Sequence, residues 1–150
     1  QYRASETESI PAMDRLIDQG HAPLVAHDAA SFEAMMDLVF EKRPLLPCPI
    51  VQAAQAQALR NTASNLRLWQ AQLKDRFLLQ ERISALRVPT LVLFGEQDMV
   101  IPRAVLQGFE SDAPELTIDF VPGAAHYIVD DQPAEVARRI AQFLRLDDSQ

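Results

Sequence analysis

Two loops, each following a predicted strand, contain a residue suited to proton transfer. One loop carries Asp98 after the apolar run at residues 91–94, and the other ends in His126 after an alternating segment at residues 116–121. An imidazole is an effective general base near neutral pH when a buried carboxylate fixes its tautomer and stabilises the cation that forms. The sequence therefore predicts that His126 is a base and that Asp98 orients it.

The elements around these loops predict an α/β arrangement. Thr90–Phe94 is short, apolar after its threonine and closed by Gly95, which is typical of a strand buried on both faces of a parallel sheet. We expect a helix over residues 103–110 and a second strand over residues 116–121. Strand, helix and strand in this order predict parallel pairing, and both reactive loops would then open onto one crevice.

A helix is predicted to close the chain after Pro133. Proline is tolerated in the first turn of a helix, and Asp130 and Asp131 lie near its positive end. Five apolar residues recur at helical spacing and predict a buried stripe: Val136, Ala137, Ile140, Ala141 and Leu144.

Residues 1–85 contain no segment with the apolar–polar alternation of a strand. This pattern predicts a helical lid or cap at residues 1–85, followed by an α/β part at residues 86–150. Ser31 is the expected N-cap of a helix over residues 32–41, and two or three helices should follow between residues 50 and 85. The first helix carries an apolar stripe that is either its core face or the roof of a pocket for an acyl or aromatic group: Phe32, Met35, Met36, Val39 and Phe40.

The order of motifs after residue 90 is similar to the C-terminal end of α/β-hydrolase-fold proteins. The matching motifs are the strand with Phe94–Asp98, Val100–Pro102, Pro122–His126 and Pro133 before a helix. In that family the order is nucleophile, acid, histidine. The resemblance implies that Asp98 is the triad acid and His126 the base, 28 residues apart (126 − 98).

The cap resembles the esterase, lipase and monoacylglycerol-lipase-like branch of that family. The similar residues are Pro23–Val25, Asp28, Phe32, Leu38–Phe40, Pro44 and Pro47–Ile50. The family often has glycine where Ala125 stands, and no Gly-x-Ser-x-Gly elbow flanks any of the serines, which are Ser5, Ser9, Ser31, Ser64, Ser84, Ser111 and Ser149. We therefore expect an incomplete fold whose nucleophile and oxyanion hole precede Gln1.

Composition excludes several other classes. The net charge of −7 and the scattered basic residues argue against nucleic acid as a partner. No apolar run approaches the roughly 20 residues of a membrane-spanning helix. The single cysteine, Cys48, cannot form an internal disulfide, which slightly favours the cytoplasm but also fits a secreted bacterial enzyme without disulfides, so the compartment stays open. His21 and His27 are expected to be solvated, and no metal-ligand spacing or cofactor motif occurs.

The resulting hypothesis is that the chain is the C-terminal half of a serine hydrolase that cleaves carboxylic esters. Its substrate would be a small hydrophobic ester or acyl compound. Alone, the chain should be inactive. The same acid and histidine loops also serve dehalogenases and carbon–carbon bond hydrolases, which the nucleophile would distinguish. A third interpretation is a non-catalytic fragment or association module, whose bare strand edge is covered by the missing N-terminal half of the fold or by another copy.

Overall fold

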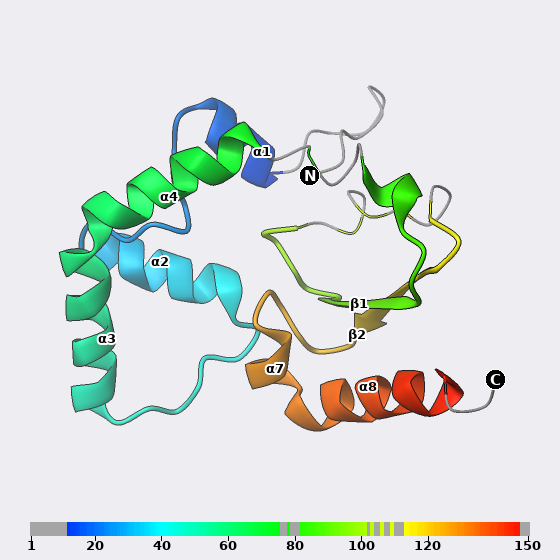
Figure 1. Cartoon of the computed structure of the whole chain (residues 1–150). Coiled ribbons are helices and arrows are strands. Elements are labelled where there is room, and N and C mark those ends of the chain that lie inside the picture. The colour runs from blue at the N-terminus through cyan, green and yellow to red at the C-terminus, as the bar shows by residue number, and fades with distance from the viewer. Residues whose placement is uncertain are drawn as a thin grey trace.

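The computed structural model describes residues 12–75, 78, 82–101, 103, 106, 109 and 113–147. The elements are α1 (Ala12–Asp18), α2 (Ala29–Val39), α3 (Cys48–Arg60), α4 (Thr62–Lys74), a 3-10 turn η1 (Ile83–Ala85), β1 (Thr90–Gly95), β2 (Leu116–Val121), α7 (Ile128–Asp131) and α8 (Pro133–Asp147). Helices α2, α3 and α4 stand to one side of the sheet, while α8 runs beside it (Figure 1). None of the described helices has the length and apolar character to cross a membrane.

The two predicted strands are both present and pair in parallel. Their register runs from Thr90 opposite Leu116 to Gly95 opposite Val121. The carboxyl ends of the strands therefore lie side by side, and the loops that leave them start at the same edge of the sheet. This edge is where Asp98 and His126 were expected to meet.

Each face of the sheet packs against a different apolar cluster. Side chains alternate between the faces of a strand, so Phe94 and Phe120 share one face and Leu93 and Val121 share the other. The first face packs on a cluster that includes Leu106. Most of the helix predicted over residues 103–110 lies outside the described residues. The second face packs against Val136 of α8.

Helix α8 begins at Pro133 as predicted, but its apolar stripe is only partly buried. Val136 is 5% exposed, whereas Ile140 is 44% and Leu144 58% exposed. Periodicity identifies the apolar face of a helix but not what covers it, and no described part of the chain covers these two side chains. Arg139 pairs with Asp119 on β2, which also joins α8 to the sheet.

Helix α2 begins earlier than predicted. Its N-cap is Asp28, whose carboxylate accepts the N–H of Ser31 at 2.7 Å, while the Ser31 hydroxyl accepts the N–H of Asp28 at 2.9 Å. Ser31 is therefore the third residue of a reciprocal capping box rather than the N-cap. The bond from the Ser31 N–H, aided by its hydroxyl, lowers the pKa of Asp28.

Strand β1 is less buried than its apolar run predicted. Residues 90–94 are half-buried, and only Gly95 is fully enclosed. The reason is topological, because β1 has one neighbouring strand among the described residues, whereas a strand buried on both faces lies inside a wider sheet. The predicted parallel α/β arrangement is confirmed, in a sheet that is narrower than such a strand requires.

Candidate active site

The structure brings Asp98 and His126 together. Their side chains meet through Nδ1 of His126 and Oδ2 of Asp98, which are 3.0 Å apart. The Asp98 side chain is 3% exposed and that of His126 is 31% exposed. The carboxylate is thus shielded from water, while the imidazole still reaches the surface.

The orientation of Asp98 is fixed from its other side. Its Oδ1 accepts the N–H of Val100 at 2.7 Å and the N–H of Ile101 at 2.9 Å. One oxygen is therefore used by the turn and the other faces the imidazole, and a carboxylate held in this way fixes the tautomer of its histidine. With Nδ1 as the donor to Asp98, Nε2 is the nitrogen that can accept a proton.

Gly95 allows the acid loop and the histidine loop to approach each other. The N–H of Gln97 donates to the carbonyl of Ala124 at 3.0 Å. A Cβ placed on Gly95 would lie 2.2 Å from the carbonyl oxygens of both Ala124 and Ala125. Since these atoms belong to the backbone, they cannot move aside as a flexible side chain could. Glycine at this position therefore sets the spacing of the two loops.

Gly95→Ala is expected to destabilise the protein by about 3 kcal/mol or more, because an added methyl group would force two backbone segments apart. Gly20→Ala is the matched control, since Gly20 has a φ of +82° but no atom within 4 Å of its Cβ position. The control should cost only about 1 kcal/mol of backbone strain. Denaturant unfolding of the native gene product measures both variants. Equal losses would show that loop spacing does not depend on Gly95.

The histidine loop tolerates alanine where the resembling family often has glycine. The only described residues with positive φ are glycines, Gly20 and Gly123 among them. Ala125 is buried at 4% exposure and does not adopt a left-handed conformation. The turn is made instead at Gly123, whose φ is +68° and whose carbonyl accepts a bond from the side chain of Gln132 at 3.1 Å. Alanine in place of the family's usual glycine at position 125 therefore does not require a different loop conformation.

Sequence reasoning missed the role of Asp131. Its carboxylate accepts three backbone N–H groups, from Ala125 at 2.9 Å, Glu41 at 3.0 Å and Lys42 at 3.1 Å. In the sequence, Asp131 is recognisable only as an acidic residue near the start of a helix. Its partners Glu41 and Lys42 are about 90 positions away, and no local pattern could have indicated them.

The surroundings of Asp131 predict a pH dependence of stability. Burial alone raises the pKa of Asp131, but hydrogen bonds from Ala125, Glu41 and Lys42, with the charge of Lys42, outweigh it and hold the pKa below its ordinary value of 3.8. The unfolded state then binds more protons as pH falls below about 4, so the contribution of Asp131 is present above that pH and lost below it.

The measurement is the difference in unfolding free energy between the wild type and Asp131→Asn, determined at about pH 6 and about pH 3. We expect this difference to shrink at the lower pH, because the unfolded wild type binds a proton at Asp131 that the folded state, with its lowered pKa, binds less readily. A difference that is equal at the two pH values would contradict the lowered pKa.

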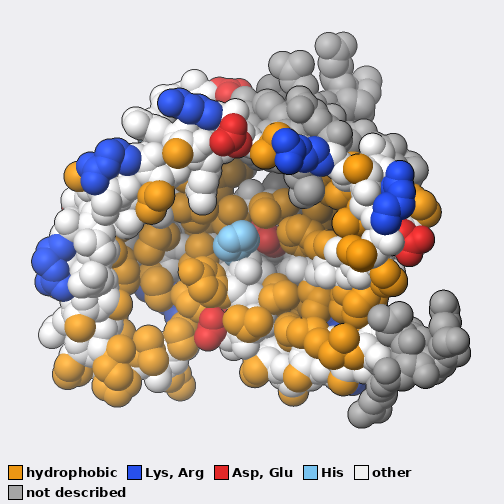
Figure 2. Space-filling model, in the orientation of Figure 1, with side chains coloured by type: hydrophobic (Ala, Val, Ile, Leu, Met, Phe, Trp, Pro, Cys, Tyr) orange, Lys and Arg blue, Asp and Glu red, His pale blue; other side chains and the backbone are white. Residues whose placement is uncertain are grey.

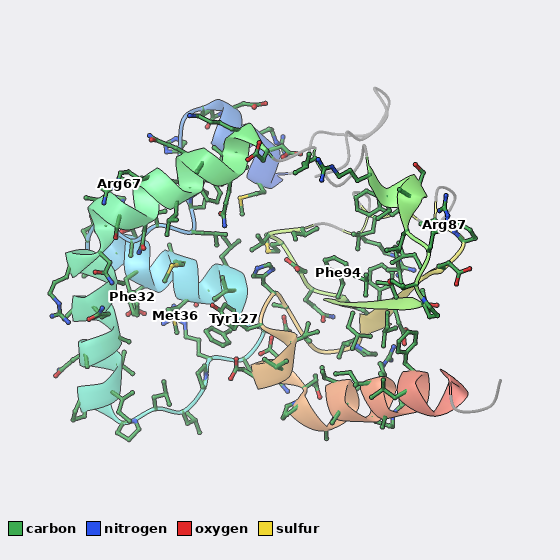
Figure 3. The ribbon with its side chains drawn as sticks, viewed as in Figure 1. Phe32, Met36, Arg67, Arg87, Phe94 and Tyr127 are labelled. Carbon is green, nitrogen blue, oxygen red and sulfur yellow. The ribbon has the colours of Figure 1, made fainter. Side chains whose placement is uncertain are left out.

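The five residues of the predicted apolar stripe, Phe32, Met35, Met36, Val39 and Phe40, have different environments. Phe32 and Val39 are buried at 3% and 5% exposure, and Val39 belongs to a core cluster with Met13 and Val100. They therefore offer little free surface. Met35 and Met36 are half-buried, and Phe40 stacks on Tyr127 at 5.0 Å between ring centroids. Figure 3 shows Tyr127 where the end of α2 meets α7. Substrate contact by this set stays a prediction.

The molecule is hollowed between helices α2–α4 and the sheet, and apolar side chains gather around this hollow (Figure 2). The remaining histidines do not extend the site, because His21 and His27 are both exposed. Within the part of the chain that the structure describes, no group of three metal-ligating side chains comes together. The hydroxyls of Ser31 and Ser64 bond to nearby carbonyls in the cap.

Several known proteins are similar to this chain, although no family model matches the sequence. Monoacylglycerol lipase abhd6-B from Xenopus laevis is 20% identical over 139 residues, which are 91% of this chain and 41% of that protein. A membrane phospholipase A, described as a bacterial virulence factor, superposes with a TM-score of 0.84 at 23% identity, over 94% of this chain and 47% of its own. A thermophilic esterase superposes with a TM-score of 0.55 at 20% identity, over 91% of this chain and 51% of its own. The chain thus spans about half the length of these relatives.

Proposed function

We propose that this chain, which has the C-terminal part of the α/β-hydrolase fold, supplies the acid and the base of a hydrolase that cleaves carboxylic esters. The observation that carries the proposal is the bond between Nδ1 of His126 and the buried carboxylate of Asp98. This bond leaves Nε2 to act as the base on a partly exposed imidazole.

The proposed reaction uses a serine from outside these residues. Nε2 of His126 takes the proton of the serine hydroxyl as its oxygen attacks the ester carbonyl. The same proton passes to the leaving alcohol when the carbon–oxygen bond breaks, which gives an acyl-enzyme. Water then attacks the acyl group by the same route and regenerates the serine. Asp98 stabilises the imidazolium in both steps without accepting its proton.

The relatives support an ester as the substrate, since their names are lipase, phospholipase and esterase. The apolar surroundings of the hollow agree with a hydrophobic acyl group. We assign residues 1–85 to a cap over the site and residues 86–150 to the hydrolase core. In this proposal Met35, Met36 and Phe40 face the acyl chain, while Phe32 and Val39 support them from the core.

The test is ester hydrolysis by the native gene product, whose intact mass is determined on the same sample. A series of p-nitrophenyl esters with increasing acyl length should be hydrolysed. Haloalkanes and diketones of matched size should not react. They are the substrates that a dehalogenase or a carbon–carbon bond hydrolase of this fold would use. A product that hydrolyses no ester but releases halide or cleaves a carbon–carbon bond would replace this proposal with the corresponding alternative.

Association is the second candidate function, because apolar side chains are exposed on the sheet side of the molecule. Val88, Ile140 and Leu144 are 61%, 44% and 58% exposed. Ile140 and Leu144 lie one turn apart on the same face of α8, and an exposed apolar patch often marks the site where a partner binds. Sedimentation velocity of the 150-residue chain tests this directly. Self-association or tight binding to a separately expressed N-terminal half would support the candidate, and a monodisperse, cooperatively folded monomer would argue against it.

A further inference from the structure

The cap and the histidine loop are joined at four points. Two are the bonds from the Glu41 and Lys42 N–H groups to the Asp131 carboxylate. The third is the bond from the Tyr127 N–H to the carbonyl of Val39 at 2.9 Å. The fourth is the stack of Phe40 on Tyr127. The segment that ends α2 is thus fastened to the segment that carries the base.

Asp131 is the centre of this junction. Its Oδ2 accepts from Glu41 in the cap and also from Ala125, the residue directly before His126. Its Oδ1 accepts from Lys42. Bonds from N–H groups to an ionised carboxylate are stronger than neutral ones, and a single carboxylate can fix several donors relative to one another. One side chain therefore sets the position of the histidine loop relative to the end of α2.

We propose that Asp131 is a positioning residue for His126, which holds the histidine loop against residues 39–42 of the cap so that the imidazole stays on Asp98. Asp131 does not touch the reacting atoms. Its catalytic consequence rests on the function proposed above, whereas the junction itself does not. The position of the base is accordingly coupled to the position of the cap.

The test variant is Asp131→Asn, which keeps the shape of the side chain but loses its charge and presents an NH2 group where an acceptor is needed. Asp130→Asn is the matched control, because Asp130 lies on the same helix and carries the same charge but is exposed. Asp131→Glu restores the charge with the carboxylate displaced by one methylene group. It also provides a second readout if the Asn variant does not fold.

We expect Asp131→Asn to lower kcat by about 10- to 100-fold, because a misplacement of about 1 Å in a catalytic group has costs of this order. KM should change less than kcat, because Met35 and Met36, which are assigned to the acyl chain, lie outside the junction. Asp131→Glu should recover part of kcat, and Asp130→Asn should match the wild type. A kcat for Asp131→Asn within about twofold of the wild type would overturn the proposal.

Hydrogen exchange measured by mass spectrometry tests the junction without reference to activity. In Asp131→Asn, and to a smaller extent in Asp131→Glu, peptides that cover residues 39–42 and residues 121–131 should both exchange faster. Faster exchange in only one segment, or in neither, would overturn the proposed coupling. If the wild type hydrolyses no ester, the proposed function fails while this comparison still decides whether Asp131 joins the two segments.

Discussion

Asp98→Asn is expected to lower the turnover of esters by the native gene product by about 10⁴-fold while the protein stays folded. The amide oxygen of asparagine can still accept the N–H groups of Val100 and Ile101, so the turn is kept. The amide NH2 then faces Nδ1 of His126 as a donor. This arrangement favours the tautomer with its proton on Nε2, which cannot act as a base.

Steady-state kinetics with a p-nitrophenyl ester measures the effect, and far-UV circular dichroism and the unfolding midpoint report the fold. Asp75→Asn is the control, since Asp75 is exposed at the end of α4. It should leave turnover unchanged. Turnover for Asp98→Asn within about tenfold of the wild type would remove Asp98 from the proposed triad, because loss of the correct tautomer costs far more than this.

His126→Gln is expected to have the larger effect, a loss of turnover on the order of 10⁶-fold, since the group proposed to accept the proton of the nucleophile is then missing. His21→Gln and His27→Gln, at exposed positions in the cap, should retain full turnover. The residual rate in the His126 variant would come from the oxyanion hole and from substrate binding.

The double variant Asp98→Asn with His126→Gln gives a sharper comparison. If Asp98 acts only through His126, the double variant should be no slower than His126→Gln alone, because groups that act as a unit have non-additive effects. Additive losses, with the double variant slower by a further factor of about 10⁴, would show that Asp98 has a separate role.

The sheet and its reactive loops could be predicted because their signals are local. The apolar run before Gly95 indicated the strand, and the loops after two parallel strands indicated where Asp98 and His126 would meet. The structure places their side chains 3.0 Å apart. The start of α2 was misplaced because Asp28 and Ser31 cap it reciprocally, and either residue alone is a plausible N-cap.

The features that could not be predicted depend on contacts between distant segments. The role of Asp131 requires Glu41 and Lys42 to lie beside it, about 90 positions away in the chain. The need for glycine at position 95 comes from the carbonyl oxygens of Ala124 and Ala125. The exposure of Ile140 and Leu144 likewise depends on what packs against α8, which periodicity alone does not contain.

The most direct test of the proposed function is labelling of the native gene product by a fluorophosphonate probe, which reacts with serines activated by a base. The labelled residue is identified by peptide mass spectrometry, and the His126→Gln variant is treated in parallel. If His126 is the base of a serine hydrolase, a serine outside residues 1–150 is labelled in the wild type and labelling is lost in the variant. An unlabelled wild-type protein, or labelling that is independent of His126, would contradict a serine hydrolase whose base is His126.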